Sequence, residues 1–202
     1  MSADPAPTAV PTARFHVTQK ITPFANQYRV HNDSGGEPGT LLAFAKQKRM
    51  AFKEQFTLFG DEGGTRPVLT IKADRRIDIR STMSVSDPAT GQLLGRLRKK
   101  GAASLVRSTW EVEQEGLPVV TVTERSVAIA VLRRVWELVP FLNSVPVPWV
   151  FHFDGTLPDG TRVFSHTRRW GIRDRYVLEV HPPLDSRLAI ALAICLDAMQ
   201  GR

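Results

Sequence analysis

A run of nine consecutive apolar residues near the C-terminus constrains the fold more than any other feature of this chain. It extends from Leu188 to Leu196, and Asp185 before it is a suitable N-cap for a helix. As a helix, nine residues span about 13.5 Å, far less than the roughly 30 Å of a membrane hydrocarbon core. A helix that is apolar on every side must be surrounded by protein or by lipid. Because the run is too short for lipid, we expect a sheet to enclose it.

The side chains of this run suit a tightly enclosed site. Small residues at Ala189, Ala191 and Ala193 allow strands to approach closely, and the Leu and Ile residues between them fill the interior. Each fully buried Leu or Ile contributes roughly 1.5 to 3 kcal/mol to folding. The chain has 202 residues, of which 42% are hydrophobic and 23% charged, values typical of one soluble globular domain.

Upstream of the run, the sequence is typical of antiparallel sheet. From Phe15 to Glu124, short apolar or alternating segments each end in turn residues, at Asn32–Gly36, Gly60–Gly64, Asp87–Gly91 and Glu115–Gly116. Glycine and Asp or Asn permit the positive φ that tight hairpins need. Further strands are predicted at Trp149–Phe153, Arg162–Thr167 and Arg175–His181, with turns predicted at Asp154-Gly155 and Pro158–Gly160.

A second helix is predicted from Ser126 to Val139, where Pro140 ends it. Many short strands and one wholly apolar terminal helix indicate a mainly β (α+β) protein. We expect a closed antiparallel β-barrel of about twelve strands that encloses a central hydrophobic C-terminal helix, plus one further helix. Residues 1–13 are rich in Ala and Pro and are predicted to form a disordered leader, and residues 14–202 a single barrel domain.

The last strand and helix resemble a known group of proteins. The segment Trp170–Val180, followed by Leu188–Ala198, resembles the end of the tubby C-terminal-like superfamily, and is closest to its LURP-one-related and scramblase-like bacterial members. Similar to the opening strands of those proteins are Gln19–Ile21, Tyr28–Val30, Ala45–Lys48 and Lys53–Leu58. The likeness covers Phe15 to Gln200. It implies a twelve-stranded barrel around a central helix, and a lipid-facing role more than a reaction.

Positive charge is concentrated in the middle of the chain. Lys and Arg number 27 against 20 Asp and Glu, a net charge of +7. Between Lys46 and Arg107 there are 14 basic and 6 acidic residues, whereas the remainder has 13 and 14. Such a field favours anionic partners, although a solvated sheet face that prevents strand pairing would have the same composition.

The resemblance implies headgroup binding by cations on one side of the barrel. The nearest candidates are Lys46, Lys48, Arg49, Arg96, Arg98, Lys99 and Lys100. Near an acidic membrane each basic residue is worth about 1 kcal/mol. The alternative is that the cluster from Arg96 to Lys100 is a charged hairpin end without a ligand. A second cluster around Trp170 is interpreted as strand-end charge that pairs with Asp174 and Glu179; it comprises Arg168, Arg169, Arg173 and Arg175.

The sequence indicates neither catalytic nor metal chemistry. The five histidines are scattered; His152 and His166 could converge from neighbouring strands, but a metal site would need a third ligand. The single cysteine, Cys195, is predicted to be part of the core, and it excludes an intramolecular disulfide. Asp185 is a thin counterpart of the calcium-linked acidic segment of scramblase members. We therefore expect no enzyme activity, no cofactor and no metal.

Two functions remain from the sequence. The first is a cytoplasmic, non-enzymatic tubby-like module that binds anionic phospholipid or a membrane surface through basic loops. The alternative is a protein-interaction scaffold that engages its partner through loops or the leader and binds no lipid. Scrambling would require the terminal helix to insert, against which its length argues. The net charge permits nucleic-acid binding, but no motif supports it.

Overall fold

The computed structural model describes residues 11–22, 25–48, 55–73, 82–100, 108–126, 152–169 and 174–200. The predicted second helix and most of the predicted leader lie outside these residues. The described residues form twelve strands and a helix: β1 (Ala13–Ile21), β2 (Ala25–Ser34), β3 (Glu37–Lys48), β4 (Gln55–Phe59), β5 (Pro67–Ala73), β6 (Thr82–Ser86), β7 (Leu93–Lys99), β8 (Thr109–Gln114), β9 (Leu117–Glu124), β10 (His152–Thr156), β11 (Arg162–Arg169), β12 (Asp174–Val180) and α2 (Ser186–Gln200).

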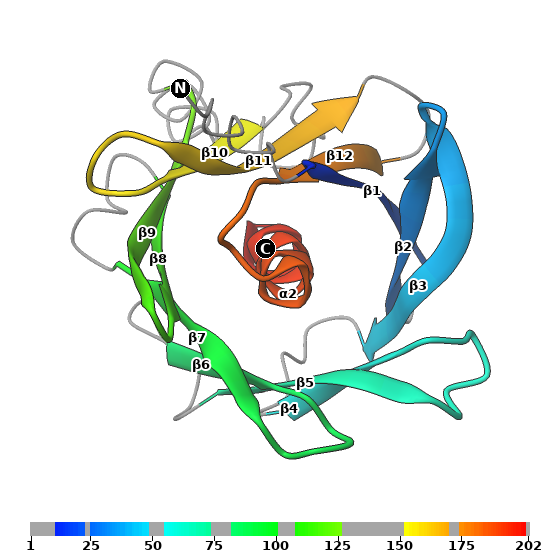
Figure 1. The fold of residues 1–202 in the computed structure, drawn as a ribbon. Coiled ribbons are helices and arrows are strands. Elements are labelled where there is room, and N and C mark those ends of the chain that lie inside the picture. Colours follow the sequence, from blue (N-terminus) through cyan, green and yellow to red (C-terminus); the bar gives the residue numbers. More distant parts are fainter. Residues whose placement is uncertain are drawn as a thin grey trace, which may run out of the picture.

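The twelve strands form one closed barrel, and α2 lies at its centre (Figure 1). Each strand pairs antiparallel with its neighbours in the chain, and β1 closes the sheet by pairing with β12 from Ala13↔Val180 to Gln19↔Asp174. Closure removes the exposed edges that an open sheet would present. The predicted architecture of a mainly β barrel around a hydrophobic terminal helix is confirmed.

The predicted turns at one end of the barrel are confirmed, with one exception, and the turn predicted at Asn32–Gly36 is confined to Gly35 and Gly36 because β2 continues to Ser34. Gly35, Gly64 and Gly116 have φ between 64° and 74°, a region that L side chains rarely adopt. The turn predicted at Asp154-Gly155 is wrong, because both residues lie inside β10 and pair with β9 and β11. A Cβ at Gly155 would lie 2.8 Å from Cβ of Phe164, so this glycine is required by close packing rather than by a turn.

The helix α2 is buried as the sequence predicts. All nine residues from Leu188 to Leu196 are at most 6% exposed, and Cys195 is fully buried. Strand β7 approaches the helix closely, because a Cβ at Gly95 would lie only 2.7 Å from a methyl carbon of Leu188. The inward side chains of all twelve strands complete a single core around the helix.

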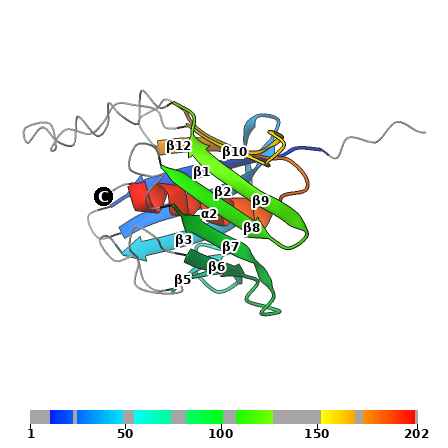
Figure 2. The same ribbon diagram turned by 90° about the vertical axis from the view of Figure 1, so that its left-hand side faces the viewer.

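Strand alternation gives the barrel two different ends. At the first, which we call the turn end, the short hairpins β2–β3, β4–β5, β6–β7, β8–β9 and β10–β11 meet the connection from β12 to α2. At the second, the basic end, the odd-numbered strands finish and α2 also finishes. Figure 2 shows α2 running lengthwise between the two ends.

The start of α2 is fixed across the turn end. The backbone amide of Asp185 donates to Gln114 Oε1 (2.8 Å), and Gln114 Nε2 donates to the carbonyl of Pro183 (3.0 Å). Asp185 Oδ1 accepts from the amide of Arg187 (2.7 Å), which confirms the predicted N-cap. Arg187 also reaches Asp87 in the β6–β7 turn (3.2 Å). The start of the helix is therefore tied to the neighbouring strands β6 to β8.

Candidate anion-binding surface

Charge is divided between the two ends of the barrel. The segments that connect elements at the turn end contain six acidic residues and one basic residue, Arg66. Near the basic end, three described lysines are exposed and form no ion pair with a described residue: Lys20, Lys46 and Lys72. Two other described cations at this end are paired, Lys100 with Glu111 and Arg125 with Asp154. Concentrated charge of one sign raises the local concentration of oppositely charged partners. The basic end is therefore the part of the surface best suited to an anion.

Carboxylates at the turn end are used by the turns themselves. Asp61 accepts hydrogen bonds from the amides of Thr65 and Arg66, at 3.1 and 2.7 Å. Asp87 and Asp159 accept from the amides of residues two positions later, each at 2.8 Å. The Thr65 amide, with its neighbours, holds the pKa of Asp61 below its ordinary value. These acidic residues thus stabilise local backbone.

The predicted cluster on β7 is partly neutralised by β8. Arg98 lies 3.0 Å from Glu113 and 3.8 Å from Glu111, and Lys100 Nζ lies 2.7 Å from Glu111. The residues predicted to form a basic loop lie in the strand, except Lys100, which follows it. Alternation points Arg96 and Arg98 outward and Lys99 inward, where its Nζ lies 5.9 Å from the Trp110 ring centre. The cluster is therefore divided between two faces of the sheet.

The candidates on β3 lie apart from those on β7. Lys46 is exposed near the basic end of β3 and forms no ion pair with a described residue. Lys48 ends the same strand, but its side chain lies outside the description, and Arg49 is outside the described residues altogether. Three strands, β4 to β6, separate β3 from β7 around the barrel. The two groups share an end of the barrel but not one continuous patch of side wall.

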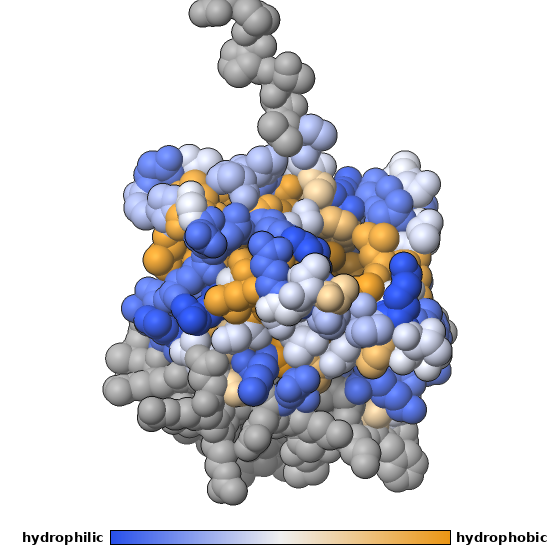
Figure 3. Space-filling model, turned by 60° about the horizontal axis from the view of Figure 1, so that its bottom comes forward, coloured by the Kyte–Doolittle hydropathy of each residue, from blue (hydrophilic) through white to orange (hydrophobic). Residues whose placement is uncertain are grey.

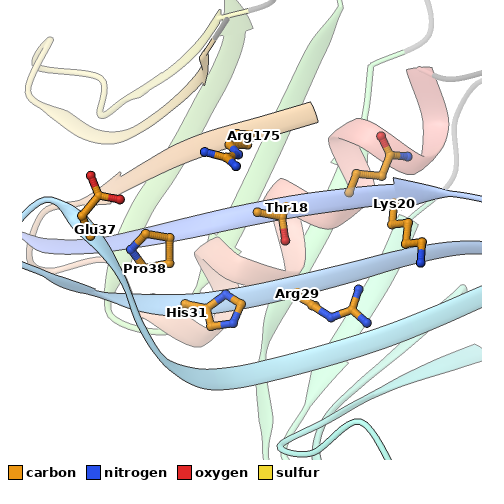
Figure 4. Close-up of a pocket in the computed structure, with 8 residues that line it drawn as sticks. Thr18, Lys20, Arg29, His31, Glu37, Pro38 and Arg175 are labelled. Carbon is orange, nitrogen blue, oxygen red and sulfur yellow. The ribbon is translucent and has the colours of Figure 1, made fainter. Parts of the chain in front are cut away.

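A groove on the outer wall of the barrel brings other cations together. It has a volume of about 510 Å³, and its floor is formed by Thr18 and Lys20 of β1, Arg29 and His31 of β2, and Arg175 of β12. Figure 4 shows these side chains on three adjacent strands, with Glu37 and Pro38 at the start of β3 closing the far side. Its cationic half lies toward the basic end, where β1 finishes and β12 begins.

Strand register explains why these cations meet. Thr18 pairs directly with Arg175 on one side and with Arg29 on the other, so the three residues form a row across β12, β1 and β2. Adjacent strands lie about 4.8 Å apart. Lys20 projects from the same face two residues further along β1, about 7 to 8 Å diagonally from either arginine. Three cations therefore surround one threonine hydroxyl.

The three cations differ in how far they are neutralised. Arg29 forms a bidentate pair with Glu62, with Nε to Oε1 at 2.7 Å and Nη2 to Oε2 at 3.0 Å. This pair raises the pKa of Arg29 and lowers that of Glu62. Lys20 and Arg175 are exposed and form no ion pair with a described residue. These two are the described cations of the groove that form no ion pair, and Lys20 lies close enough to Glu62 to help lower the pKa of that carboxyl.

The far wall of the groove is the β2–β3 hairpin. Register shifts near His31 in the β2–β3 pairing bend this hairpin, as β-bulges do. At its base His16 Nε2 lies 2.6 Å from Asp33 Oδ1, and this contact lowers the pKa of Asp33. Burial, with Arg29 and His16 nearby, lowers the pKa of His31, so this imidazole is neutral at pH 7.

Sequence reasoning missed most of this groove. Lys20, Arg29 and His31 were not singled out, and Arg175 was expected to pair with Asp174 or Glu179. Glu179 instead lies 3.6 Å from Arg14, and Arg175 faces the groove. The alternation of Thr18 and Lys20 with buried residues was a usable signal that they face outward. The contact between β1 and β12, however, joins opposite ends of the sequence and was not predictable from spacing.

The histidines, the cysteine and the tyrosine that could take part in catalysis or metal binding form no such site among the described residues. His152 and His166 lie on paired strands, but His152 faces outward and His166 inward, so they do not converge. No group of three metal-ligating side chains occurs among the described residues. Burial raises the pKa of the Cys195 thiol, which therefore stays protonated. The hydroxyl of Tyr176 donates to Asp197 (2.7 Å) and so ties β12 to the end of α2.

The outer surface is mixed in polarity. On the face in Figure 3, apolar and strongly hydrophilic residues are intermixed over the coloured part of the surface. In the described part of the chain, the exposed large hydrophobic residues lie on three different strands: Leu42, Leu93 and Val119. Scattered apolar residues of this kind are normal for a protein surface.

Within the described segments, no helix combines the length and the apolar character needed to cross a bilayer.

These features define a closed antiparallel barrel built around a helix, with a basic end and a cationic groove on one wall. A family model described as LURP-one-related matches residues 42–197, well over half of the chain. The chain therefore belongs to the LURP-one-related family. No curated protein matches the chain. The family match begins inside β3, so of the groove residues only Arg175 falls within it.

Proposed function

We propose that this protein is a non-enzymatic, tubby-like module that binds anionic phospholipid at a membrane surface through the basic end of its barrel. The observation that carries the proposal is that Lys20, Lys46 and Lys72 lie exposed near one end without an ion pair to a described residue, whereas the connections at the other end are acidic. Basic residues near an acidic leaflet contribute about 1 kcal/mol each, and the contribution disappears beyond a Debye length. An end rich in cations can therefore hold the barrel on an anionic surface without inserting into it.

The family and the resemblance both support this role. LURP-one-related proteins are not a known enzyme family, and we assign no reaction to this chain. The resemblance of the last strand and helix to the tubby superfamily, which includes phosphoinositide-holding proteins, favours a lipid-facing role. Of the residues predicted from the sequence, exposed Lys46 is the clearest contributor among the described ones. Arg98 and Lys100 contribute less, because Glu111 and Glu113 lie beside them.

Vesicle co-sedimentation tests the proposal. The full chain should bind vesicles that contain phosphatidylserine and should not bind neutral phosphatidylcholine vesicles, and high salt should release it. The double substitution Lys46→Glu and Lys72→Glu reverses two exposed cations near the basic end and should weaken partitioning at least tenfold. The control is Arg162→Glu, which reverses one exposed cation at the start of β11, at the turn end, and should change partitioning less than twofold.

Two results would contradict the proposal. Equal failure to bind neutral and acidic vesicles would favour the protein-interaction scaffold. A loss of binding free energy in Arg162→Glu that is half the loss in the basic-end pair would show that net charge acts without regard to position, because the single variant changes half as much charge.

A further inference from the structure

We propose that the groove formed by β12, β1, β2 and the β2–β3 hairpin binds a phosphate monoester of a polyol. The inference rests in part on the proposed function, because it gives the membrane-binding module a defined headgroup site. The site is carried by side chains that the family match mostly does not cover.

The arrangement of donors fits a phosphate group. Arg175 and Lys20 form no ion pair with a described residue, and Thr18 lies between Arg175 and Arg29 in the strand register. Arginine presents paired N–H groups that match two phosphate oxygens, lysine supplies a point charge, and threonine supplies a hydroxyl donor. A monoester carries between one and a half and two negative charges near pH 7, whereas a diester carries one. A site with two or three cations therefore favours the monoester.

Arg29 is a third cation of the groove, and it is already paired with a carboxylate. Its guanidinium is fixed over the Phe44 ring at 5.2 Å from the ring centre, and it is bound by Glu62. Glu62 comes from the β4–β5 turn and its side chain is 55% exposed. A phosphate entering beside Thr18 would compete with this carboxylate for Arg29. Glu62 is thus expected to weaken anion binding, and its removal should strengthen it.

The other half of the groove suits hydroxyl groups rather than a second phosphate. Glu37 lies opposite the cations and would repel an anion, but its carboxylate can accept hydrogen bonds from hydroxyls. His31 is neutral at pH 7 and offers one donor and one acceptor. A volume of about 510 Å³ is several times that of one phosphate and lies within the range of small-molecule sites. The ligand is therefore oriented with its phosphate at Arg175 and Lys20 and its polyol toward Glu37.

Isothermal titration with glycerol 3-phosphate tests the groove directly on the full chain. The double substitution Lys20→Ala and Arg175→Ala should weaken binding at least tenfold, since it removes both groove cations that form no ion pair with a described residue. The control Arg162→Glu changes the net charge by the same two units at an exposed position of the turn end that does not line the groove, and it should leave binding of this soluble ligand unchanged. Glu62→Gln should strengthen binding about two- to fivefold. Weaker binding in Glu62→Gln, or equal loss in the double variant and the Arg162→Glu control, would overturn the proposal.

A vesicle arm separates a lipid source from a soluble one. Phosphatidic acid has the glycerol 3-phosphate headgroup as a monoester, whereas phosphatidylglycerol is a diester. If the natural ligand is a lipid, the chain prefers phosphatidic acid vesicles, and the double variant loses that preference while keeping the general attraction to anionic vesicles. If glycerol 3-phosphate binds in the groove but no vesicle is bound, the groove stands and the membrane proposal fails. Vesicle binding with no binding of glycerol 3-phosphate and no preference for the monoester lipid would refute the groove and leave the membrane proposal intact.

Discussion

The two ends of the barrel carry charges of opposite sign that have different structural roles. At the turn end, carboxylates accept hydrogen bonds from backbone amides, and Asp185 and Asp87 hold the start of the central helix through Arg187. At the basic end, Lys20, Lys46 and Lys72 stand exposed on their strands without an ion pair to a described residue. The acidic residues at the turn end stabilise local structure, whereas these three lysines at the other end remain available for a ligand. Other cations of the basic end are already paired, because Arg98 and Lys100 lie beside Glu111 and Glu113 and Arg125 lies beside Asp154.

The largest expected difference between the two ends is in how much the packing of α2 contributes to the free energy of unfolding. Leu188, at the turn end of α2, is fully buried against Gly95 of β7, whereas Met199, in the last turn, is only partly buried. Leu188→Ala should lower the free energy of unfolding by about 3 kcal/mol, and Met199→Ala by about 1 kcal/mol. Urea denaturation of the two variants measures this. Equal losses would show that the helix is held no more firmly at the turn end.

The core of the barrel contains a histidine, His166, that should make the stability of the fold depend on pH, unlike the carboxylates at the turn end. Burial lowers the pKa of His166 to about 3, against an ordinary value of 6.5. Between these values the unfolded chain binds a proton that the folded chain does not, so stability falls as pH falls from 6.5 toward 3. The pKa values of Asp33 and Asp61 are held below their ordinary value of 3.8, so these carboxylates do not titrate between pH 7 and 5.

We expect the wild type to lose about 2 kcal/mol more stability between pH 7 and pH 5 than His166→Phe loses. Phe preserves a ring beside Tyr176, whose ring centre lies 4.7 Å from that of His166. Urea midpoints at the two pH values give the comparison. Parallel pH profiles for the two proteins would mean that His166 is protonated in the folded state.

The cap of the helix tests whether carboxylates at the turn end are structural. Asp185→Ala removes the acceptor of the Arg187 amide and the partner of the Arg187 guanidinium, which lies 2.9 Å away. The free energy of unfolding should fall by about 1 kcal/mol, with no loss of vesicle binding. Asp185→Asn, which keeps a side-chain acceptor, is the matched control and should lose less. A change in vesicle binding would place this end of the barrel at the membrane.

The smallest effect on vesicle binding is expected from removing the carboxylate that pairs with Arg98 of β7 and Lys100 after it. Glu111→Gln removes the carboxylate beside Lys100 and Arg98 and should strengthen partitioning to phosphatidylserine vesicles about twofold. Stability should change by less than about 1 kcal/mol, because surface ion pairs contribute little. Unchanged or weaker vesicle binding would show that these two cations do not face the lipid.

The sequence predicted the architecture because the decisive features are local. A run of apolar residues from Leu188 to Leu196 and hairpins marked by Gly64 or Gly116 do not depend on distant contacts. The wrong turn at Gly155 shows the limit of this reasoning, because the sequence does not distinguish a glycine needed for φ from one needed for close packing. The spacing of residues in the sequence also did not predict which residues pair across neighbouring strands.

The candidate site shows that limit more clearly. Seven cations were predicted from local density, but density does not reveal Glu111 and Glu113 on the next strand, which neutralise part of the cluster. Nor does it reveal that Thr18 pairs with Arg175, because the barrel closes between residues about 160 positions apart. A site made by register across the closing strands becomes visible only in three dimensions.

Orientation on the vesicle tests the central claim most directly. Cys195 is fully buried, so a cysteine introduced at an exposed position can be labelled selectively with an environment-sensitive fluorophore. Gln55→Cys places the label at the basic end and Thr90→Cys at the turn end, both at exposed positions. On phosphatidylserine vesicles, the label at position 55 should move to a less polar environment, with a clear increase in emission, and the label at position 90 should not. An equal response from both labels, a larger response at position 90, or no response at all would contradict the account.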